Sequence, residues 1–325
     1  MLQAHQEIDN PSPALAGPGM AAAARRAFLA TRPAFFIASS MPVAIGTAWA
    51  YATYHRFDGL LFALALAATV LAHAAANVYN DVGDDVIGAD AGNKDRIYPY
   101  TGGSRFIQTG LLSRAQMARL ALGLASAALL LGALLAVLRG PGVILLGIMG
   151  LGLGLLYSLP GAQLSARGVG ETAIGVAFGA LPVLGAVWLQ TGTIDAGAVL
   201  ICIPVGAWAA AILIINEVPD LEADRGAHKF TLVVRWGVHG ARWIYWGLTA
   251  LALAASCAAI LRHALPLWYT LAALVLASLG LKAALGMATE PAARPRLKRS
   301  IELTLAIHAL GCSALIASVL LKRFW

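Results

Sequence analysis

The sequence is poor in charged residues. Only 12% of its 325 residues are Asp, Glu, Lys or Arg, about half of the roughly 25% that soluble domains carry. Hydrophobic residues make up 59% of the chain, and the mean hydropathy is +0.75. A chain of this length has room for two soluble domains, but no polar stretch is long enough to form one. The composition therefore excludes an ordinary soluble enzyme and predicts a single domain within a membrane.

Cysteine is scarce as well. Cys202, Cys257 and Cys312 each lie in an apolar run without CxxC or Cys/His spacing, which argues against a disulfide framework or a zinc site. The net charge of +7 does not indicate nucleic acid, because the basic residues are not gathered on a soluble element. The N-terminus lacks a basic segment leading into a short apolar core, so we expect no signal peptide. We expect residues 1–27 to form a disordered cytoplasmic tail and residues 28–325 a single transmembrane domain.

Long apolar runs recur along the chain. A bilayer is crossed by about 20 apolar residues, and such segments should be helical because lipid offers no partners to free backbone groups. The fold class is therefore an all-α integral membrane protein with about nine transmembrane helices. The predicted segments lie near 34–53, 58–80, 114–138, 142–160, 169–190, 197–216, 241–261, 265–286 and 300–321.

Basic residues are distributed unequally between the two sets of loops. If the N-terminus is cytoplasmic, one side holds most of them, from Arg25 to Arg299. The opposite side keeps only Arg56, Arg139, Arg262, Lys322 and Arg323. This asymmetry matches the positive-inside rule and predicts a bacterial inner membrane protein. Both acidic motifs described next would then face the cytoplasm.

The first acidic motif follows the second apolar segment and runs from Asn80 to Asp90. His73, Asn77, Asn80 and Asp84 are spaced i, i+4, i+7 and i+11, so one helical face should present them together. Polar groups at a membrane helix are costly and usually functional. Oxygen ligands of this kind suit Mg²⁺, and we expect four uncompensated carboxylates, those of Asp81, Asp84, Asp85 and Asp90, to be relieved by a bound cation. His73 is either a packing residue or a substrate contact.

A basic, glycine-containing loop follows the first motif. Lys94, Arg96 and Arg105 flank Gly102 and Gly103 in this loop. Their side chains either bind phosphate oxygens, for which Arg offers bidentate contacts, or simply add positive charge to the cytoplasmic side. The sequence leaves both interpretations open.

The second acidic motif follows the sixth apolar segment. Asn216, Asp220 and Asp224 are spaced i, i+4 and i+8, and Lys229 follows. Pro219 should bend or break the helix within the motif, and Glu222 and Arg225 should form a solvated pair. A second cation site with a nearby ammonium fits a diphosphate held from two sides. Such a site would stabilise a departing diphosphate, while a membrane cavity would shield the resulting allylic cation from water.

Together, the two motifs resemble those of the UbiA-type intramembrane prenyltransferases, in the branch that prenylates 1,4-dihydroxy-2-naphthoate. Asn80-Asp81-x-x-Asp84-x-x-x-Gly88-x-Asp90 is similar to that branch's NDxxDxxxGxD. Asn216-x-x-x-Asp220-x-x-x-Asp224, continuing to Lys229-x-Thr231-Leu232, is similar to its NNxxDxxxDxxxGKxTL. The segment from Tyr157 to Glu171 fits the same branch, and the resemblance covers the chain from about residue 28 to its end.

The resemblance implies an all-helical fold around a central cavity, dependence on Mg²⁺, and a polyprenyl diphosphate bound between the motifs. The catalytic residues would be Asp84, Asp90, Asp220 and Asp224. The metal ligands would be Asn80, Asp81, Asp84, Asp90, Asp220 and Asp224. The substrate-binding residues would be His73, Asn77, Asn80, Lys94, Arg96, Arg105, Tyr157, Asn216 and Lys229.

The sequence departs from this branch at several positions. Glu217 replaces its usual second Asn, His228 replaces a Gly, and Ala162 stands where Lys is frequent. The expected reaction joins the polyprenyl group to an aromatic acceptor, 1,4-dihydroxy-2-naphthoate in menaquinone synthesis. Alternative acceptors are 4-hydroxybenzoate, another quinone precursor or a tetrapyrrole. A cation transporter is the alternative from another class, but its acidic residues should lie near the bilayer midplane at broken helices.

Overall fold

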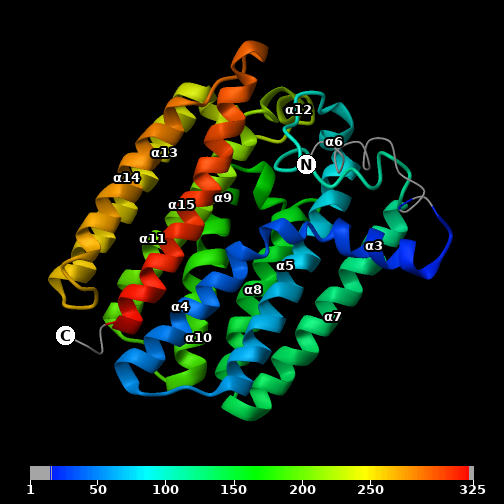
Figure 1. Ribbon diagram of the computed structural model, residues 1–325. Coiled ribbons are helices and arrows are strands. Elements are labelled where there is room, and N and C mark those ends of the chain that lie inside the picture. The colour runs from blue at the N-terminus through cyan, green and yellow to red at the C-terminus, as the bar shows by residue number, and fades with distance from the viewer. Residues whose placement is uncertain (1–14, 16, 322–325) are drawn as a thin grey trace.

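The structure is a computed structural model that describes residue 15 and residues 17–321. These residues form helices and connecting segments and contain no strand. Figure 1 shows a bundle of steeply inclined helices with short helices at its upper end. The helices of the bundle are α4 (Ile37–Tyr54), α5 (Gly59–Ile87), α7 (Arg114–Arg139), α8 (Gly142–Ser158), α10 (Leu181–Thr191), α11 (Ala196–Glu217), α13 (Leu232–Leu261), α14 (Tyr269–Leu285) and α15 (Arg294–Leu321). The other α-helices are α3 (Met20–Ala30), α6 (Ala89–Gly92), α9 (Gly170–Gly175) and α12 (Leu221–Gly226).

The apolar segments of the sequence coincide with these helices. Among the described residues, seven helical spans are long and apolar enough to cross a membrane, and α8 and α14 are shorter apolar helices of 17 residues each. One of the seven spans joins α9 to α10 through the single π-turn η3 (Val176–Ala180). The all-α membrane fold is therefore confirmed, whereas nine crossings stay a prediction.

Helix boundaries follow from local chemistry. The Asp58 side chain accepts hydrogen bonds from the first backbone N–H groups of α5, as expected for an N-cap. Helix α5 then continues beyond the predicted end near residue 80 and stops at Gly88, where φ is +78°. Helix α11 ends at Glu217, just before Pro219, as the sequence predicted. The first acidic motif thus lies on a continuous helix, and the second spans a helix break.

The bundle is packed around α11, most of whose residues are buried. Helices α13, α14 and α15 lie on one side of it, and α5, α7 and α8 lie on the other (Figure 1). The carboxylate of Asp195, just before α11, accepts hydrogen bonds from Trp49 Nε1 (2.8 Å) and Tyr54 Oη (2.7 Å). The Gln190 amide pairs with the backbone N–H and C=O of Asp58 at 2.7 and 3.0 Å. These contacts tie the α4–α5 turn to the α10–α11 turn.

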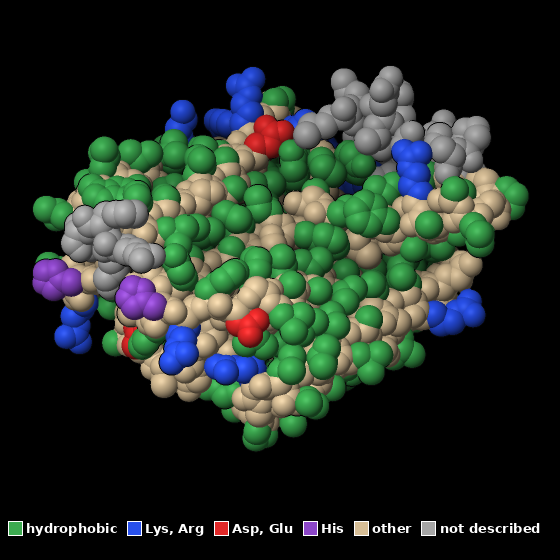
Figure 2. Space-filling view, turned by 60° about the horizontal axis from the view of Figure 1, so that its bottom comes forward, with side chains coloured by type: hydrophobic (Ala, Val, Ile, Leu, Met, Phe, Trp, Pro, Cys, Tyr) green, Lys and Arg blue, Asp and Glu red, His purple; other side chains and the backbone are tan. Residues whose placement is uncertain are grey.

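The N-terminal segment differs from the expectation. Residues 20–27, predicted to belong to a disordered tail, form most of helix α3. Arg26 anchors this helix by donating to backbone carbonyls of Leu15 and Gly17. Tail positions 1–14 and 16 lie outside the described residues. In Figure 2, the face that includes the lower end of the bundle is dominated by hydrophobic side chains, with few charged ones between them. That surface suits contact with lipid.

Candidate active site

A cavity of about 690 Å³ lies between α5, α7, α8, α10 and α11. One end of the cavity is polar, and the remainder is lined mainly by Ala, Gly and Leu. His73, Asn77, Asn80 and Asp84 all line it. The predicted face of the second apolar helix is therefore confirmed, because α5 stays helical through all four positions.

The second motif lines the same cavity from the opposite side. Asn216 lies on the last turn of α11, Asp220 in the break after Pro219, and Asp224 on α12. The backbone N–H of Asp224 donates to the Asp220 carbonyl at 2.8 Å, which restarts the helix. Two segments more than a hundred residues apart in the sequence thus face each other across one polar space.

Lys229 connects the two motifs. Its Nζ lies 3.2 Å from Asp84 Oδ2 and 3.6 Å from Asp224 Oδ1, and its side chain is 14% exposed. Burial by itself would lower the pKa of Lys229, but the carboxylates of Asp84 and Asp224 outweigh burial and hold the pKa well above its usual value. The ammonium therefore stays charged and is able to donate to an anionic ligand.

Asp90 and Asp220 are positioned by the loop between α6 and α7. Asp220 accepts hydrogen bonds from Asn93 Nδ2 at 2.7 Å and from the Gly102 backbone N–H at 3.2 Å. Gly103, at φ +70°, lies so close to Asp90 that a Cβ atom would be 2.5 Å from Oδ2. Burial, followed by the charge of Asp84, raises the pKa of Asp90 to about 7. The role of Asn93 was missed because its partner is 127 residues away.

The expectation of four uncompensated carboxylates is wrong. Asp81 accepts hydrogen bonds from Arg32 at one oxygen and from Ser104 at the other. Asp85 is paired with Arg114 Nε at 2.6 Å, and Asp84 is paired with Lys229. Asp81 and Asp85 do not line the cavity. We therefore leave Asp81 out of the proposed metal ligands and assign it the positioning of Arg32.

Arg32 lines the cavity, although its place in the sequence indicated only positive charge on the cytoplasmic side. Its backbone is left-handed (φ +55°), its guanidinium contacts Asp81, and it lines the polar end of the cavity. Asp84, Asp90 and Asp220 all act electrostatically on it. Arg32 thus adds a second cation beside Lys229, and a left-handed arginine just before Pro33 offers no recognisable sequence motif.

Three predicted phosphate ligands do not reach the cavity. Lys94 is exposed on the loop surface. Arg96 is buried, with its guanidinium 5.7 Å from the Tyr98 ring centroid. Arg105 donates to the backbone carbonyl of Asp90. None of the three lines the cavity, so the structure places Arg96 and Arg105 within the loop that holds Asp90.

Several other predicted contacts do line the cavity. Asn77 Nδ2 donates to the Thr31 carbonyl at 3.0 Å, and Asn80 Nδ2 donates to Ser158 Oγ at 3.4 Å. Tyr157 lines the polar end. His73 Nδ1 lies 3.0 Å from Ser39 Oγ, with the Phe178 ring 4.6 Å away edge-on. His73 is therefore packed and hydrogen-bonded while still presenting a surface to the cavity.

The polar end offers oxygen ligands that fit Mg²⁺. Asp84 Oδ1, Asp90 Oδ2 and Asn216 Oδ1 are buried without a hydrogen-bond partner in the described part of the chain. Nowhere among the residues that the structure describes do three or more His, Cys, Asp or Glu side chains lie close enough together to enclose a metal ion. Hard oxygen ligands that do not form a complete cage suit an ion that also takes ligands from water and phosphate, as Mg²⁺ does.

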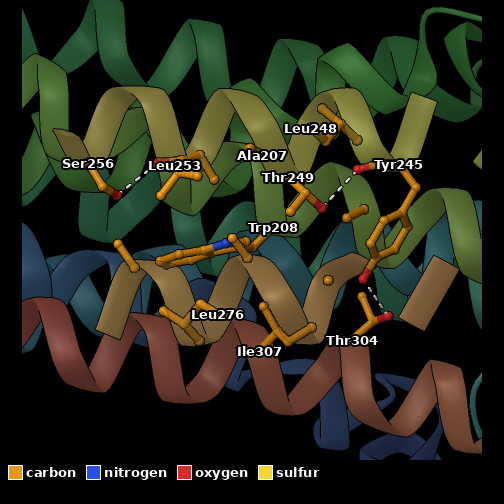
Figure 3. Close-up of a pocket in the computed structure, with 15 residues that line it drawn as sticks. Ala207, Trp208, Tyr245, Leu248, Thr249, Leu253, Ser256, Leu276, Thr304 and Ile307 are labelled. Carbon is orange, nitrogen blue, oxygen red and sulfur yellow. Dashed lines mark hydrogen bonds between the residues drawn. The ribbon is translucent and has the colours of Figure 1, made fainter. Parts of the chain in front are cut away.

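A second hollow, shown in Figure 3, lacks these properties. It lies between α11, α13, α14 and α15 and encloses about 10 Å³, enough for about one water molecule. Its side-chain hydroxyl groups already have partners: Tyr245 Oη lies 2.8 Å from Thr304 Oγ1, and Thr249 Oγ1 donates to the Tyr245 carbonyl at 3.0 Å. We interpret it as a packing seam.

Comparison with known proteins agrees with this geometry. The UbiA prenyltransferase family matches residues 39–308. The 1,4-dihydroxy-2-naphthoate octaprenyltransferase of Mycobacterium tuberculosis is 34% identical over 244 residues, covering 75% of this chain and 79% of that protein. The protein of the same name from Escherichia coli is 32% identical over 206 residues, covering 62% and 65% respectively. The matched segment thus spans slightly less than two thirds of the E. coli protein.

Solved structures share the fold. A UbiA homolog from Aeropyrum pernix K1 superposes with a TM-score of 0.64 at 21% identity, covering 85% of this chain and 97% of that one. A UbiA homolog from Archaeoglobus fulgidus, bound to DMAPP and Mg²⁺, gives 0.62 at 16% identity and covers 89% and 98%. Family match, sequence identity and fold agree, so the chain belongs to the UbiA prenyltransferase family and is an integral membrane transferase.

Proposed function

We propose that this protein transfers a polyprenyl group from its diphosphate to 1,4-dihydroxy-2-naphthoate, with Mg²⁺, on the way to menaquinone. The observation that carries the proposal is the joining of both acidic motifs at one end of an apolar cavity, with Lys229 between Asp84 and Asp224. Relatives from M. tuberculosis and E. coli named for this reaction support the acceptor. The DMAPP- and Mg²⁺-bound homolog supports the donor and the ion.

The polar end would bind the diphosphate. Asn80, Asp84, Asp90, Asp220 and Asp224 are the proposed ligands of Mg²⁺, which when bound neutralises the diphosphate and stabilises its departure. Lys229 and Arg32 would donate to phosphate oxygens, with Arg32 capable of bidentate contact. Asn93 and Gly102 hold the Asp220 carboxylate in place. These donors are fixed before the substrate arrives, which is the condition for effective electrostatic stabilisation.

The reaction breaks two bonds, the C1–O bond of the donor and the ring–carboxylate bond of the acceptor, and forms one carbon–carbon bond. The C1–O bond of the donor breaks, and the electron pair leaves with the diphosphate. The acceptor ring carbon that bears the carboxylate attacks C1, and the ring regains aromaticity as that carboxylate departs as CO₂. Tyr157 and Phe178 line the cavity, and their aromatic rings would stabilise the allylic cation. The apolar walls exclude the water that would otherwise capture it.

Glu217 favours a second candidate acceptor. It replaces the usual Asn of the naphthoate branch, lines the cavity, and lies beside the buried carboxyl group of Glu171. The Oε2 atom of each of these residues has no hydrogen-bond partner among the described residues. An acid at this wall would change the groups that meet the acceptor hydroxyl. The second candidate is 4-hydroxybenzoate, one of the alternative acceptors given by the sequence, with the same donor chemistry.

Localisation is proposed together with the function. Both acidic motifs lie at the end of the bundle that carries α6 and α12 (Figure 1). The basic residues of the sequence concentrate in the loops of this end, which the positive-inside rule assigns to the cytoplasm. We propose a bacterial inner membrane with the active site open to the cytoplasmic side, where soluble Mg²⁺ and acceptor are supplied.

The test is a transfer assay with the purified full-length protein in lipid nanodiscs. Geranylgeranyl diphosphate, Mg²⁺ and either 1,4-dihydroxy-2-naphthoate or 4-hydroxybenzoate are supplied, and the prenylated product is measured by mass spectrometry. We expect product from the naphthoate. Product from 4-hydroxybenzoate alone would move the assignment to the second candidate, and absence of product from both would refute the proposal.

A matched pair of variants tests the site itself. Asp84→Asn removes a charge that lines the cavity, whereas Asp85→Asn removes a charge one residue away that faces Arg114. We expect Asp84→Asn to lower kcat at least 100-fold, the usual effect of removing a group that stabilises transition-state charge. Asp85→Asn should stay within about threefold, since an ion pair with a mostly exposed partner contributes little. Equal losses in both variants would place the site elsewhere.

A further inference from the structure

The cavity extends far beyond its acidic end and closes at the opposite end of the bundle. Val43, Leu135, Val143 and Leu189 line it there and belong to one buried hydrophobic cluster. A polyprenyl tail whose diphosphate lay at the acidic end would meet this cluster and could not continue along the bundle axis. A long tail therefore needs an exit through the side of the protein.

The side wall is open between α7 and α8. Leu122 and Leu129 of α7 and Leu155 of α8 line the cavity, yet they are 68%, 57% and 49% exposed. Side chains with one surface toward the cavity and another toward the outside mark a continuous opening. On a surface of this hydrophobicity the outside is lipid, which is a suitable medium for the far end of a polyprenyl chain.

Glycines of α8 keep space along this route. Gly147, Gly150 and Gly154 are spaced i, i+3 and i+7, so they share a helical face, and all three line the cavity. A Cβ atom at Gly147 or Gly150 would meet no atom within 4 Å. Close helix packing therefore does not explain them, in contrast to Gly142, where a Cβ atom would be 2.6 Å from the Trp188 ring. Glycine destabilises a helix interior relative to alanine, which leaves the open volume as their evident use.

We propose that Gly147 and Gly150 set the donor chain lengths that this enzyme accepts, an inference that rests on the proposed function. The two glycines would do so by keeping open the path along which the polyprenyl tail leaves between α7 and α8. The occupant is the polyprenyl tail of the donor. Continuity supports this assignment, because the same cavity holds the unpartnered buried oxygens of Asp84 and Asp90 at its polar end.

The rise per residue of a helix gives the distances of Gly147 and Gly150 from the acidic end of the cavity, which can be compared with the lengths of the donor chains. Ser158, the partner of Asn80, ends α8 at the acidic end of the cavity. At 1.5 Å per residue, Gly150 lies about 12 Å and Gly147 about 16 Å along α8 from Ser158. An extended chain advances about 1.2 Å per bond, which gives about 10 Å for geranyl, about 14 Å for farnesyl and about 19 Å for geranylgeranyl. Farnesyl thus extends past Gly150 but ends before Gly147.

The experiment measures kcat/KM for these three donors in nanodiscs, with the full chain carrying Gly150→Leu or Gly147→Leu. Gly150→Leu should reduce the farnesyl and geranylgeranyl values at least tenfold relative to geranyl. Gly147→Leu should reduce only the geranylgeranyl value to that extent. The matched control is Gly152→Leu on the same helix, where an added Cβ atom also meets nothing within 4 Å but the residue does not line the cavity. The control should leave the donor ratios unchanged.

Several outcomes would overturn the proposal. These are unchanged donor ratios in both variants, the same cutoff in both, or equal loss on all three donors. If a leucine prevents folding, Gly150→Ala replaces it and should lower the farnesyl and geranylgeranyl kcat/KM relative to geranyl by a smaller factor. Unchanged donor ratios in Gly150→Ala would then count against the proposal. The ratios do not depend on which acceptor is used. Failure of the wild-type protein to prenylate the naphthoate would therefore refute the proposed acceptor, while chain-length selection would still be measured with whichever acceptor reacts.

Discussion

Replacing Lys229 by methionine is the most direct test of the two ion pairs through which Lys229 links the acidic motifs. Methionine keeps an unbranched side chain of similar length but removes the ammonium that lies 3.2 Å from Asp84 Oδ2 and 3.6 Å from Asp224 Oδ1. Both carboxylates are at least nine-tenths buried. The variant therefore isolates the charge of Lys229 from its packing.

The magnitude follows from the burial of the pair. Removing one partner of a buried ion pair lowers the free energy of unfolding by about 3–5 kcal/mol. Here the loss exposes two carboxylates to each other's repulsion, so we expect the upper part of that range in EDTA. Mg²⁺ would take over the compensation and restore part of the stability. At 100 times its dissociation constant, a ligand specific to the folded state contributes about 2.7 kcal/mol.

Activity should fall for a related reason. Lys229 is proposed to donate to the departing diphosphate, and removing one such donor usually lowers kcat about 100- to 1000-fold. Prenyl transfer and thermal unfolding, each with Mg²⁺ and with EDTA, are measured on Lys229→Met and on the control Lys298→Met. Lys298 is half-exposed and lies 4.0 Å from Glu302, so its loss should change both quantities little. A Lys229→Met protein with kcat within threefold of wild type, or with the same Tm in EDTA, would refute the reasoning.

Two further predictions concern stability. Burial raises the pKa of both Asp90 and Asp224 to about 7, so these two groups bind more protons in the folded protein than in the unfolded chain up to about that pH. Above about pH 6.5, where the histidines of the unfolded chain are already neutral, this difference sets the sign, and stability in EDTA should fall as the pH rises to about 8. A Tm that rises over this range would contradict the assignment. Asp195→Ala removes the α11 N-cap together with the hydrogen bonds from Trp49 and Tyr54. It should lower the free energy of unfolding by about 2–3 kcal/mol and leave kcat unchanged. The control is Asp95→Ala, at an exposed ion pair 3.4 Å from Arg294, which should lower the free energy of unfolding by less than about 1 kcal/mol.

The sequence by itself determined the features that depend on local periodicity. Apolar runs long enough for a bilayer predicted the helices, because an isolated backbone in lipid must satisfy its own hydrogen bonds. The i, i+4, i+7 and i+11 spacing placed His73, Asn77, Asn80 and Asp84 on one face, and all four line the cavity. Pro219 marked the end of α11. These predictions succeed because they involve residues within a few turns of each other.

Tertiary structure alone decided which charges meet. Arg32 and Asp81 are 49 residues apart, and Asn93 and Asp220 are 127 residues apart, and no local pattern links either pair. The loop after α6 holds Arg96 and Arg105 outside the cavity, although their spacing suited phosphate binding equally well. The opening between α7 and α8 likewise depends on how two helices are placed, not on either sequence. Helix spacing fixes what one segment presents, whereas packing between distant segments fixes which groups share a site.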